Sequence, residues 1–472
     1  MVPIRLTSPP QTTPLTILLY PSKHRTHISV DRKGNRDLSD VEDLPSGDSD
    51  EFKTRFAVVL DKLEQLPAIM TITQLLSNAS SQSISAPTES GTDEKASIRE
   101  ASSIRPISMD AMRLIELTQR TSAVMMSAES DYLLQTDPVV SVFRTFGALN
   151  HVPVRASISV ASYDEFSNSV ARHVDDSASQ MLLVPWKAAV NEDAAGSVGF
   201  NPFENLFKTT VATEHSTEVV NSHYIRKVFA GTRADVCLII DRGLSASGSP
   251  ADQHIFLPFF GGPDDRLALS LVVQLCAGDS GVTATVVRIR KTGGAEIVYA
   301  TEEAKTTVQN VRVSHLKWNG MLIHNRFFQT VFPDTVYDHQ STQTRLASDT
   351  ADDLIWGRYT SSKAADTTIR EAIGRIAFSE ERTDKPLHFV QTLASTLQQQ
   401  SRRTRSRRLL IVAGRSRRMA TESHTAELKT LLAESRASIG GEATKTLGEV
   451  GTAVISGDVG EGVLVVQARV TA

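Results

Sequence analysis

The strongest constraint on the fold is a series of short, almost wholly apolar runs, which alternate with segments of helical spacing. A strand that is apolar along its whole length is typical of a parallel sheet, because helices cover both of its faces. Strands that alternate with helices therefore predict an α/β fold with right-handed crossovers. The runs predicted as strands are residues 56–60, 152–160, 180–185, 235–240, 254–260, 282–289, 408–414 and 462–467.

The same order of elements recurs in the two parts of the chain, on either side of a Gly- and Ser-rich stretch at residues 245–250. Each part reads strand, helix, strand, helix, strand, helix, strand, which predicts an internal duplication. The segments predicted as helices are 66–76, 109–126, 138–149, 163–178 and 225–230, then 264–276, 386–399 and 446–455, with a further short element at 369–378.

Composition divides the chain into a leading segment and two predicted domains. Residues 1–53 are polar and broken by prolines, and we expect a linker that is partly disordered. We expect the first domain at 54–244, with a disordered insertion at about 77–107 and a loop insertion at about 187–220. We expect the second at 252–471, with insertions at about 292–365, containing weak strands near Val311 and Phe328, and at about 418–445.

Bulk chemistry excludes several classes of function. The formal net charge is −4, which does not favour nucleic-acid binding. Cys237 and Cys276 lie in apolar runs and are predicted to be buried thiols, with no spacing for a metal. The histidines are scattered, and neither a nucleophile elbow nor a Walker lysine loop is present. We therefore expect no enzyme, no catalytic residue and no metal site, and, without a long apolar run, no membrane span.

Several segments together resemble a known family. They are residues 112–122, expected as a helix, and 137–147, 235–244, 259–269, 410–415 and 447–451. Each half resembles the universal stress protein fold, an adenine nucleotide alpha hydrolase-like fold with a parallel sheet and helices on both faces. The pair of halves resembles the cytosolic C-terminal regulatory region of fungal potassium/proton antiporters, relatives of the plant cation/proton exchangers. Residues 12–16 and 19–21 resemble the segment that follows the last transmembrane helix of these antiporters.

The resemblance implies a function and partners. It implies a cytosolic regulatory module that controls monovalent-cation/proton exchange by a membrane domain of the same protein, as a homodimer. The location implied is the cytosolic face of a Golgi-like endomembrane or of the plasma membrane, with this chain itself soluble. An alternative is a structural dimerisation and assembly module with vestigial nucleotide pockets.

The resemblance also implies a ligand, because universal stress proteins often bind adenine nucleotides such as AMP or ATP. In the second half, Gly261 and Gly262 permit close backbone approach, and Asp264 and Asp265 can accept hydrogen bonds from ribose. The alternative is a helix start with Asp264 as its N-cap.

The other predicted ligand residues, Gly414, Arg415 and Ser416, lie where the family has a phosphate loop; the second glycine of that motif is missing. The alternative here is a tight turn with solvated arginines. The first half lacks the glycine pair after residues 182–187 and departs from the motif. The basic run at 401–408 is either a solvated loop or a contact with anionic lipid headgroups.

Overall fold

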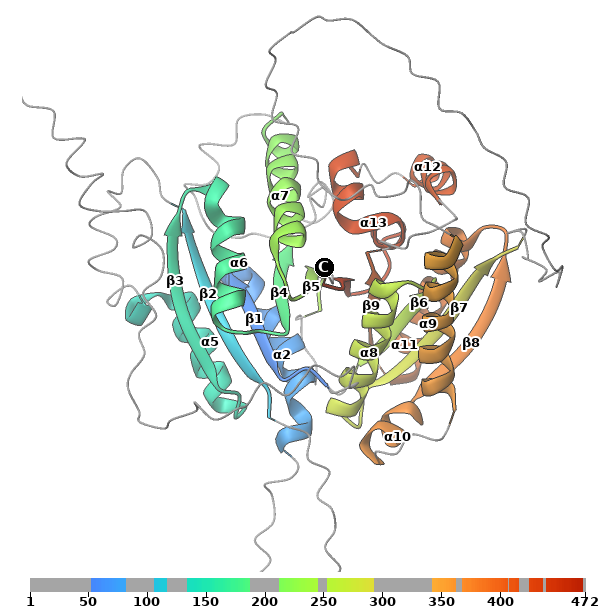
Figure 1. Cartoon of the computed structure of the whole chain (residues 1–472), viewed down its shortest axis with the longest axis horizontal. Coiled ribbons are helices and arrows are strands. Elements are labelled where there is room, and N and C mark those ends of the chain that lie inside the picture. The colour runs from blue at the N-terminus through green and yellow to red at the C-terminus, as the bar shows by residue number, and fades with distance from the viewer. Residues whose placement is uncertain are drawn as a thin grey trace, which may run out of the picture.

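The computed structural model describes residues 52–81, 106–116, 134–186, 212–244, 253–292, 342–361, 367–405, 407–415, 424–435 and 439–469. These residues form one ten-stranded sheet with the order β3-β2-β1-β4-β5-β10-β9-β6-β7-β8. Helices cover both faces of the sheet (Figure 1). The prediction of an α/β fold with a large, mostly parallel sheet is confirmed.

The two parts of the chain share one strand order. In the first part, all neighbouring strands are parallel, and the first strand lies at the centre, between the second and the fourth. The second part repeats this arrangement, with β6 between β7 and β9. The strands are β1 (Arg55–Leu60), β2 (Ser108–Glu116), β3 (Val154–Ala161), β4 (Met181–Trp186) and β5 (Asp235–Asp241), then β6 (Gln253–Phe259), β7 (Thr283–Lys291), β8 (Ile376–Thr383), β9 (Arg408–Gly414) and β10 (Gly462–Gln467).

The parts meet through β5 and β10, which form the antiparallel pair of the sheet. Their register runs from Asp241 opposite Gly462 to Val236 opposite Gln467. Every residue of β10 is buried, and so is all of β5 except Asp241. The join is therefore an interior strand pair, in which both strands have a hydrogen-bonded neighbour on each side.

The helices form one layer on each face. One face carries α2 (Leu66–Ser81), α5 (Pro138–Leu149), α8 (Pro263–Gly278), α9 (Thr342–Thr360) and α10 (Thr367–Ile373). The other carries α6 (Phe166–Asp176), α7 (Ala212–Gly231), α11 (Pro386–Arg405) and α13 (Gly441–Ser456), with α12 (Thr425–Glu434) packed on α11 and α13. Two short 3₁₀ turns, η2 (Leu63–Gln65) and η3 (Tyr163–Glu165), precede α2 and α6.

Four element predictions differ from the structure. The single short element predicted at 369–378 divides into the end of α10 and the start of β8. The segment predicted as a helix over 109–126 begins with strand β2, because Met109, Met112 and Leu114 are buried between β1 and β3; residues 117–126 lie outside the described part. Helix α7 begins at Ala212, inside a predicted loop, and α9 lies in a segment predicted to be irregular.

Helices α7 and α9 are rich in polar residues, so the apolar periodicity of their sequences is weak. Tertiary contacts, rather than the local sequence pattern, determine that these segments are helical. The leading segment up to residue 51, most of the insertion at 77–107 and the weak strands near Val311 and Phe328 lie outside the described residues.

We predict an acid-sensitive contribution to stability from His254 on β6. Its ring nitrogens lie 2.8 and 3.1 Å from the hydroxyls of Thr283 and Thr285 on β7. Burial, aided by the positive charge of Arg407, lowers the pKa of His254 from 6.5 to about 4. Between about pH 6.5 and pH 4, His254 is protonated in the unfolded chain and neutral in the folded chain. The free energy of unfolding therefore falls as the pH is lowered through this window.

The measurement is urea unfolding at several pH values in this window. The His254→Gln variant keeps a polar side chain that does not titrate, and its midpoint is expected to fall less on acidification than that of the unmodified protein. The exposed His151→Asn control is expected to show the unmodified slope. Equal slopes for His254→Gln and the unmodified protein would contradict this assignment.

Candidate functional site

Five of the predicted ligand residues lie at the turn between β6 and α8. Gly261 and Gly262 have φ values of 101° and 93°, a region that favours glycine. Gly414, at the end of β9, lies against the first turn of α8: a Cβ there would be 2.0 Å from Asp265 Oδ1. The structure therefore brings Gly261, Gly262 and Gly414 together with the acidic pair. Ser416 lies outside the described residues.

The acidic pair is engaged with the protein's own backbone. Asp265 Oδ2 accepts hydrogen bonds from the amides of Phe260 and Gly261, at 2.6 and 2.9 Å. Asp264 Oδ1 accepts one from the amide of Ala468, at 2.8 Å. Both residues are 2% exposed or less. In this arrangement the two carboxylates fix the glycine turn and the end of β10.

The alternative in which Asp264 caps the helix was wrong in its detail. The N-cap is Gly262, Pro263 takes the first helical position, and Asp264 follows it inside the first turn. Proline suits that position because its φ is already helical and it has no N–H to satisfy. The acidic residues still lie where a carboxylate interacts favourably with the helix dipole, an effect of about 0.3–1 kcal/mol.

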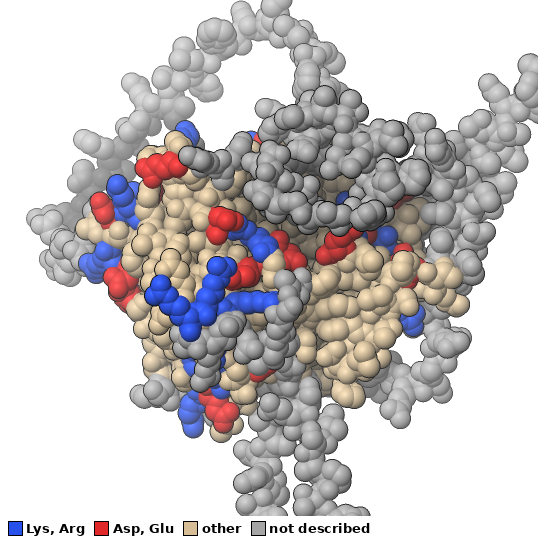
Figure 2. Space-filling view, turned by 180° about the vertical axis from the view of Figure 1, so that it is seen from behind, with Lys and Arg blue, Asp and Glu red and all other residues tan. Residues whose placement is uncertain are grey.

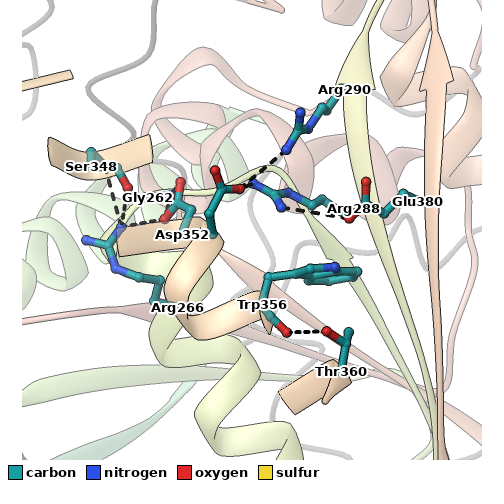
Figure 3. Close-up of polar contacts among 10 residues, drawn as sticks. Gly262, Arg266, Arg288, Arg290, Ser348, Asp352, Trp356, Thr360 and Glu380 are labelled. Carbon is teal, nitrogen blue, oxygen red and sulfur yellow. Dashed lines mark hydrogen bonds and ion pairs between the residues drawn. The ribbon is translucent and has the colours of Figure 1, made fainter. Parts of the chain in front are cut away.

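The amide at the start of α8 is bound by a carboxylate from a distant helix. Gly262 N donates to both oxygens of Asp352 on α9, at 3.0 and 2.9 Å (Figure 3). Arg266 Nη1 also donates to Asp352, and lies 3.3 Å from the carbonyl oxygen of Ser348. Asp352 is 3% exposed. An internal anion thus occupies the position at which helix N-termini bind phosphate or carboxylate groups.

The next residue of α9 extends the same charge pattern. Asp353 Oδ1 accepts from Arg288 at 2.5 Å and from Arg290 at 3.4 Å, both on β7 (Figure 3). Arg288 also lies 3.8 Å from Glu380 and 5.6 Å from the ring centroid of Trp356. One turn of α9 therefore brings two carboxylates and a tryptophan to arginines from two elements.

Arg415 serves a different set of contacts. Its guanidinium donates to the carbonyl oxygens of Thr446 and Lys445, at 3.0 and 2.8 Å, and to Gln467 Oε1 at 2.5 Å. It lies 4.4 Å from the ring centroid of Phe229, on α7 of the first part. The side chain is buried. Although Arg415 follows Gly414 in sequence, its charged group contacts α13, β10 and α7.

Sequence reasoning missed Asp352, Asp353 and the arginines Arg266, Arg288 and Arg290. The available signal was the acidic pair of α9, which mirrors the pair at Asp264 and Asp265. Without periodicity in the surrounding segment, nothing indicated that this pair would lie against β7 and α8. That contact is a property of the tertiary structure.

The basic run at 401–408 belongs to the end of α11 and the start of β9 rather than to a loop. Arg402 pairs with Glu461 at 2.7 Å, Arg407 donates to Thr283 at 2.8 Å, and Arg408 donates to the carbonyl oxygen of Leu244. Figure 2 shows basic and acidic side chains next to one another on the face seen from behind. These contacts involve three of the arginines in the run.

The described residues offer neither a group of side chains placed to hold a metal ion nor a reactive thiol. No group of three or more His, Cys, Asp or Glu side chains there is placed to hold a metal ion. Cys237 and Cys276 are free and buried, as predicted, and burial raises the pKa of each thiol to about 12. Such thiols stay protonated and are poor nucleophiles. Among the described helices, none is both long and apolar enough to cross a bilayer.

Comparison with known proteins shows what part of the chain is related to. A family model described as plant cation/H(+) antiporter domain matches residues 109–244, from β2 to the residues just after β5. Cation/H(+) antiporter 17 of Arabidopsis thaliana is 26% identical over 200 residues, 39% of this chain and 22% of the relative. Cation/H(+) antiporter 1 of the same plant is 35% identical over 101 residues, 21% of this chain and 13% of the relative. Residues 109–244 are therefore a region related to cation/proton antiporters.

The chain spans about a fifth of the length of antiporter 17. Among solved structures, a universal stress protein from Archaeoglobus fulgidus aligns with this chain at 7% sequence identity and a TM-score of 0.33. The alignment covers 87% of this chain and 97% of the other. A score this low adds nothing to the strand order already described.

We predict that the bend in α13 requires glycine at position 448. Gly448 has φ 74° and ψ 175°, and a Cβ there would lie 2.2 Å from the carbonyl oxygen of Arg415. Gly448→Ala is expected to lower the free energy of unfolding by about 2–4 kcal/mol, from backbone strain together with displacement of Arg415. The measurement is urea unfolding followed by circular dichroism.

Gly441→Ala is the matched control in the same helix. An added Cβ there meets no atom within 4 Å, so the change is expected to be neutral or slightly stabilising. If both variants unfold at the same urea concentration, the constraint at Gly448 does not exist.

Proposed function

We propose that this chain is a cytosolic regulatory region of a potassium or other monovalent-cation/proton antiporter. The observation that carries this proposal is the match of residues 109–244 to the antiporter domain model, which spans β2 to β5. The mostly parallel sheet supports it, since ligands of open α/β sheets bind at the carboxyl ends of strands. Regulation, rather than catalysis, is the proposed role.

The proposed partner is a membrane domain that exchanges the ions. A regulatory region acts on such a domain only if its ligand or partner has unequal affinity for two states of the transporter. The proposed location is the cytosolic face of a Golgi-like endomembrane or of the plasma membrane. The arginine-rich end of α11 is then a proposed contact with anionic headgroups, for which exposed Arg403 is suited.

The proposed ligand is an adenine nucleotide at the strand ends of the second half, near Gly261, Gly262, Asp264, Asp265 and Gly414, with Arg415 and Ser416 following in the chain. The contacts of the acidic pair favour a second candidate function. Because Asp264, Asp265 and Arg415 are engaged with protein atoms, an assembly module with vestigial pockets fits the same region.

The assembly version carries a restriction on geometry. Strands β5 and β10 pair within one chain, so a homodimer has to use another surface. Each end of the sheet is formed by another strand, β3 or β8. Light scattering tests assembly directly: a strict monomer at high protein concentration would count against the assembly module.

The regulatory proposal predicts an effect on ion exchange. The membrane part of cation/H(+) antiporter 17 would be placed in vesicles, followed either by this chain or by an unrelated globular protein of similar size. Potassium-driven release of a preformed pH gradient is expected to differ at least about twofold between the two, because a region that binds unequally to two transport states shifts their populations. Identical rates at equal protein amounts would contradict the proposal.

A further inference from the structure

Two neighbouring carboxylates of α9, those of Asp352 and Asp353, bind the main-chain amide and the arginines at this end of the sheet. We propose that the end of the sheet formed by β6, β7 and the start of α8 is a site for a phosphate-bearing ligand, and that Asp352 and Asp353 occupy it as an internal competitor. The inference rests on the proposed ligand function of this edge, and adds the residues that bind and the element that regulates binding.

The first observation is the chemistry at Gly262. Its amide points at a carboxylate and donates to both oxygens, while Arg266 donates to the same group. A main-chain amide at a helix N-terminus together with a guanidinium is the pairing that holds phosphate oxygens. The carboxylate is not local to the turn: Asp352 lies 90 positions along the chain from Gly262.

The second observation comes from a different element. Arg288 and Arg290 on β7 both reach Asp353, the neighbour of Asp352 (Figure 3). Arg266, Arg288 and Arg290 carry three positive charges. Outside α9, Glu380 lies 3.8 Å from Arg288, and the carboxylates of Asp264 and Asp265 lie in the first turn of α8 and bind the amides of Ala468 and Gly261. Without α9, the guanidinium groups of these arginines and the amide of Gly262 would lose the carboxylates that they bind. Guanidinium and main-chain amide groups are the donors that phosphate oxygens accept from, so a phosphate group can take the place of these carboxylates.

The third observation is how α9 is held. Trp356 and Tyr359 are its buried aromatic residues, and the ring centroid of Trp356 lies 5.5 Å from that of Phe259 and 5.5 Å from that of Phe378. Leu354, beside the acidic pair, is 70% exposed. Ile355 also packs against the core, and the hydroxyl of Tyr359 lies 3.3 Å from that of Ser270. The acidic pair adds ion pairs with Arg266, Arg288 and Arg290. A phosphate-bearing ligand and Asp352 cannot both accept from the amide of Gly262, so their binding is mutually exclusive.

The decisive test weakens the competitor and measures the ligand. Pyrophosphate, AMP and ADP are titrated by calorimetry into the whole chain and into Asp352→Asn/Asp353→Asn. If α9 occupies the site nine-tenths of the time or more, the variant is expected to bind at least about 10-fold more tightly, because apparent affinity scales with the fraction of free sites. Asp384→Asn, an exposed change in the same half, is the matched control and is expected to bind like the unmodified chain.

A third variant shows whether the gain belongs to this site. Adding Arg266→Gln to the double variant removes a proposed phosphate-binding group and is expected to abolish the gain. Binding of pyrophosphate alone identifies a site for the phosphates, whereas binding confined to AMP and ADP identifies one that also requires the nucleoside. Both results agree with the proposal, while a gain that survives Arg266→Gln overturns it.

A second readout uses the unmodified chain and does not depend on the stability of a variant. When a ligand displaces α9, the ring of Trp356 leaves its buried contacts, so tryptophan emission is expected to shift to longer wavelength on saturation with ADP or pyrophosphate. The Trp356→Phe protein is expected to lose this shift. Binding without a shift in the unmodified chain would overturn the displacement.

Two further outcomes separate this inference from the proposed function. Equal affinity in the unmodified chain and the double variant would show that α9 does not compete, and would leave a nucleotide site possible elsewhere on the edge. No binding by either protein would overturn the site itself. Neither result would alter the ion-exchange assay, by which the regulatory proposal stands or fails separately.

Discussion

The antiparallel pair of β5 and β10 is the interaction on which the rest of the structure depends. It converts two parallel five-stranded arrangements into one continuous sheet. Both strands are buried, so neither presents an open edge where another strand could add. Because the pair is antiparallel, the carboxyl end of β10 lies beside the amino end of β5, and the strand ends of the second half border the first half there.

Polar contacts at this border link the candidate site to the first half. Asp235, at the start of β5, accepts from the amide of Arg469 at 2.7 Å and pairs with Lys53. Gln467 donates to the carbonyl oxygen of Phe229, and Arg415 stacks on the ring of that residue. Buried polar groups with satisfied hydrogen bonds fix one arrangement, because leaving one unpaired costs about 1–3 kcal/mol. A ligand at the turn before α8 would therefore act close to a rigid border between the halves.

The turn before α8 carries features of a ligand site and of a structural contact at once. Its two glycines adopt positive φ, and their main-chain amides bind carboxylate oxygens, as the amides of phosphate-binding turns bind phosphate oxygens. Its acidic residues bind neighbouring amides, and Asp352 binds the amide of Gly262. These contacts separate the site into a fixed part, Asp264 and Asp265, and a part supplied by another helix. The second part is the one that an external anion can replace.

The sequence by itself determined the α/β class, because apolar runs such as 235–240 and 462–467 are buried on both faces and alternate with amphipathic segments. It also placed Gly261 and Gly262 just after a strand, at the carboxyl edge of the sheet, and predicted a strand that ends at Gly414. That Gly414 packs against Asp265 is a result of the tertiary structure. Only the tertiary structure decided that β2 is a strand, that Arg415 faces Phe229, and that α9 brings Asp352 to Gly262. Those outcomes depend on partners far away in the chain, and local periodicity carries no information about such partners.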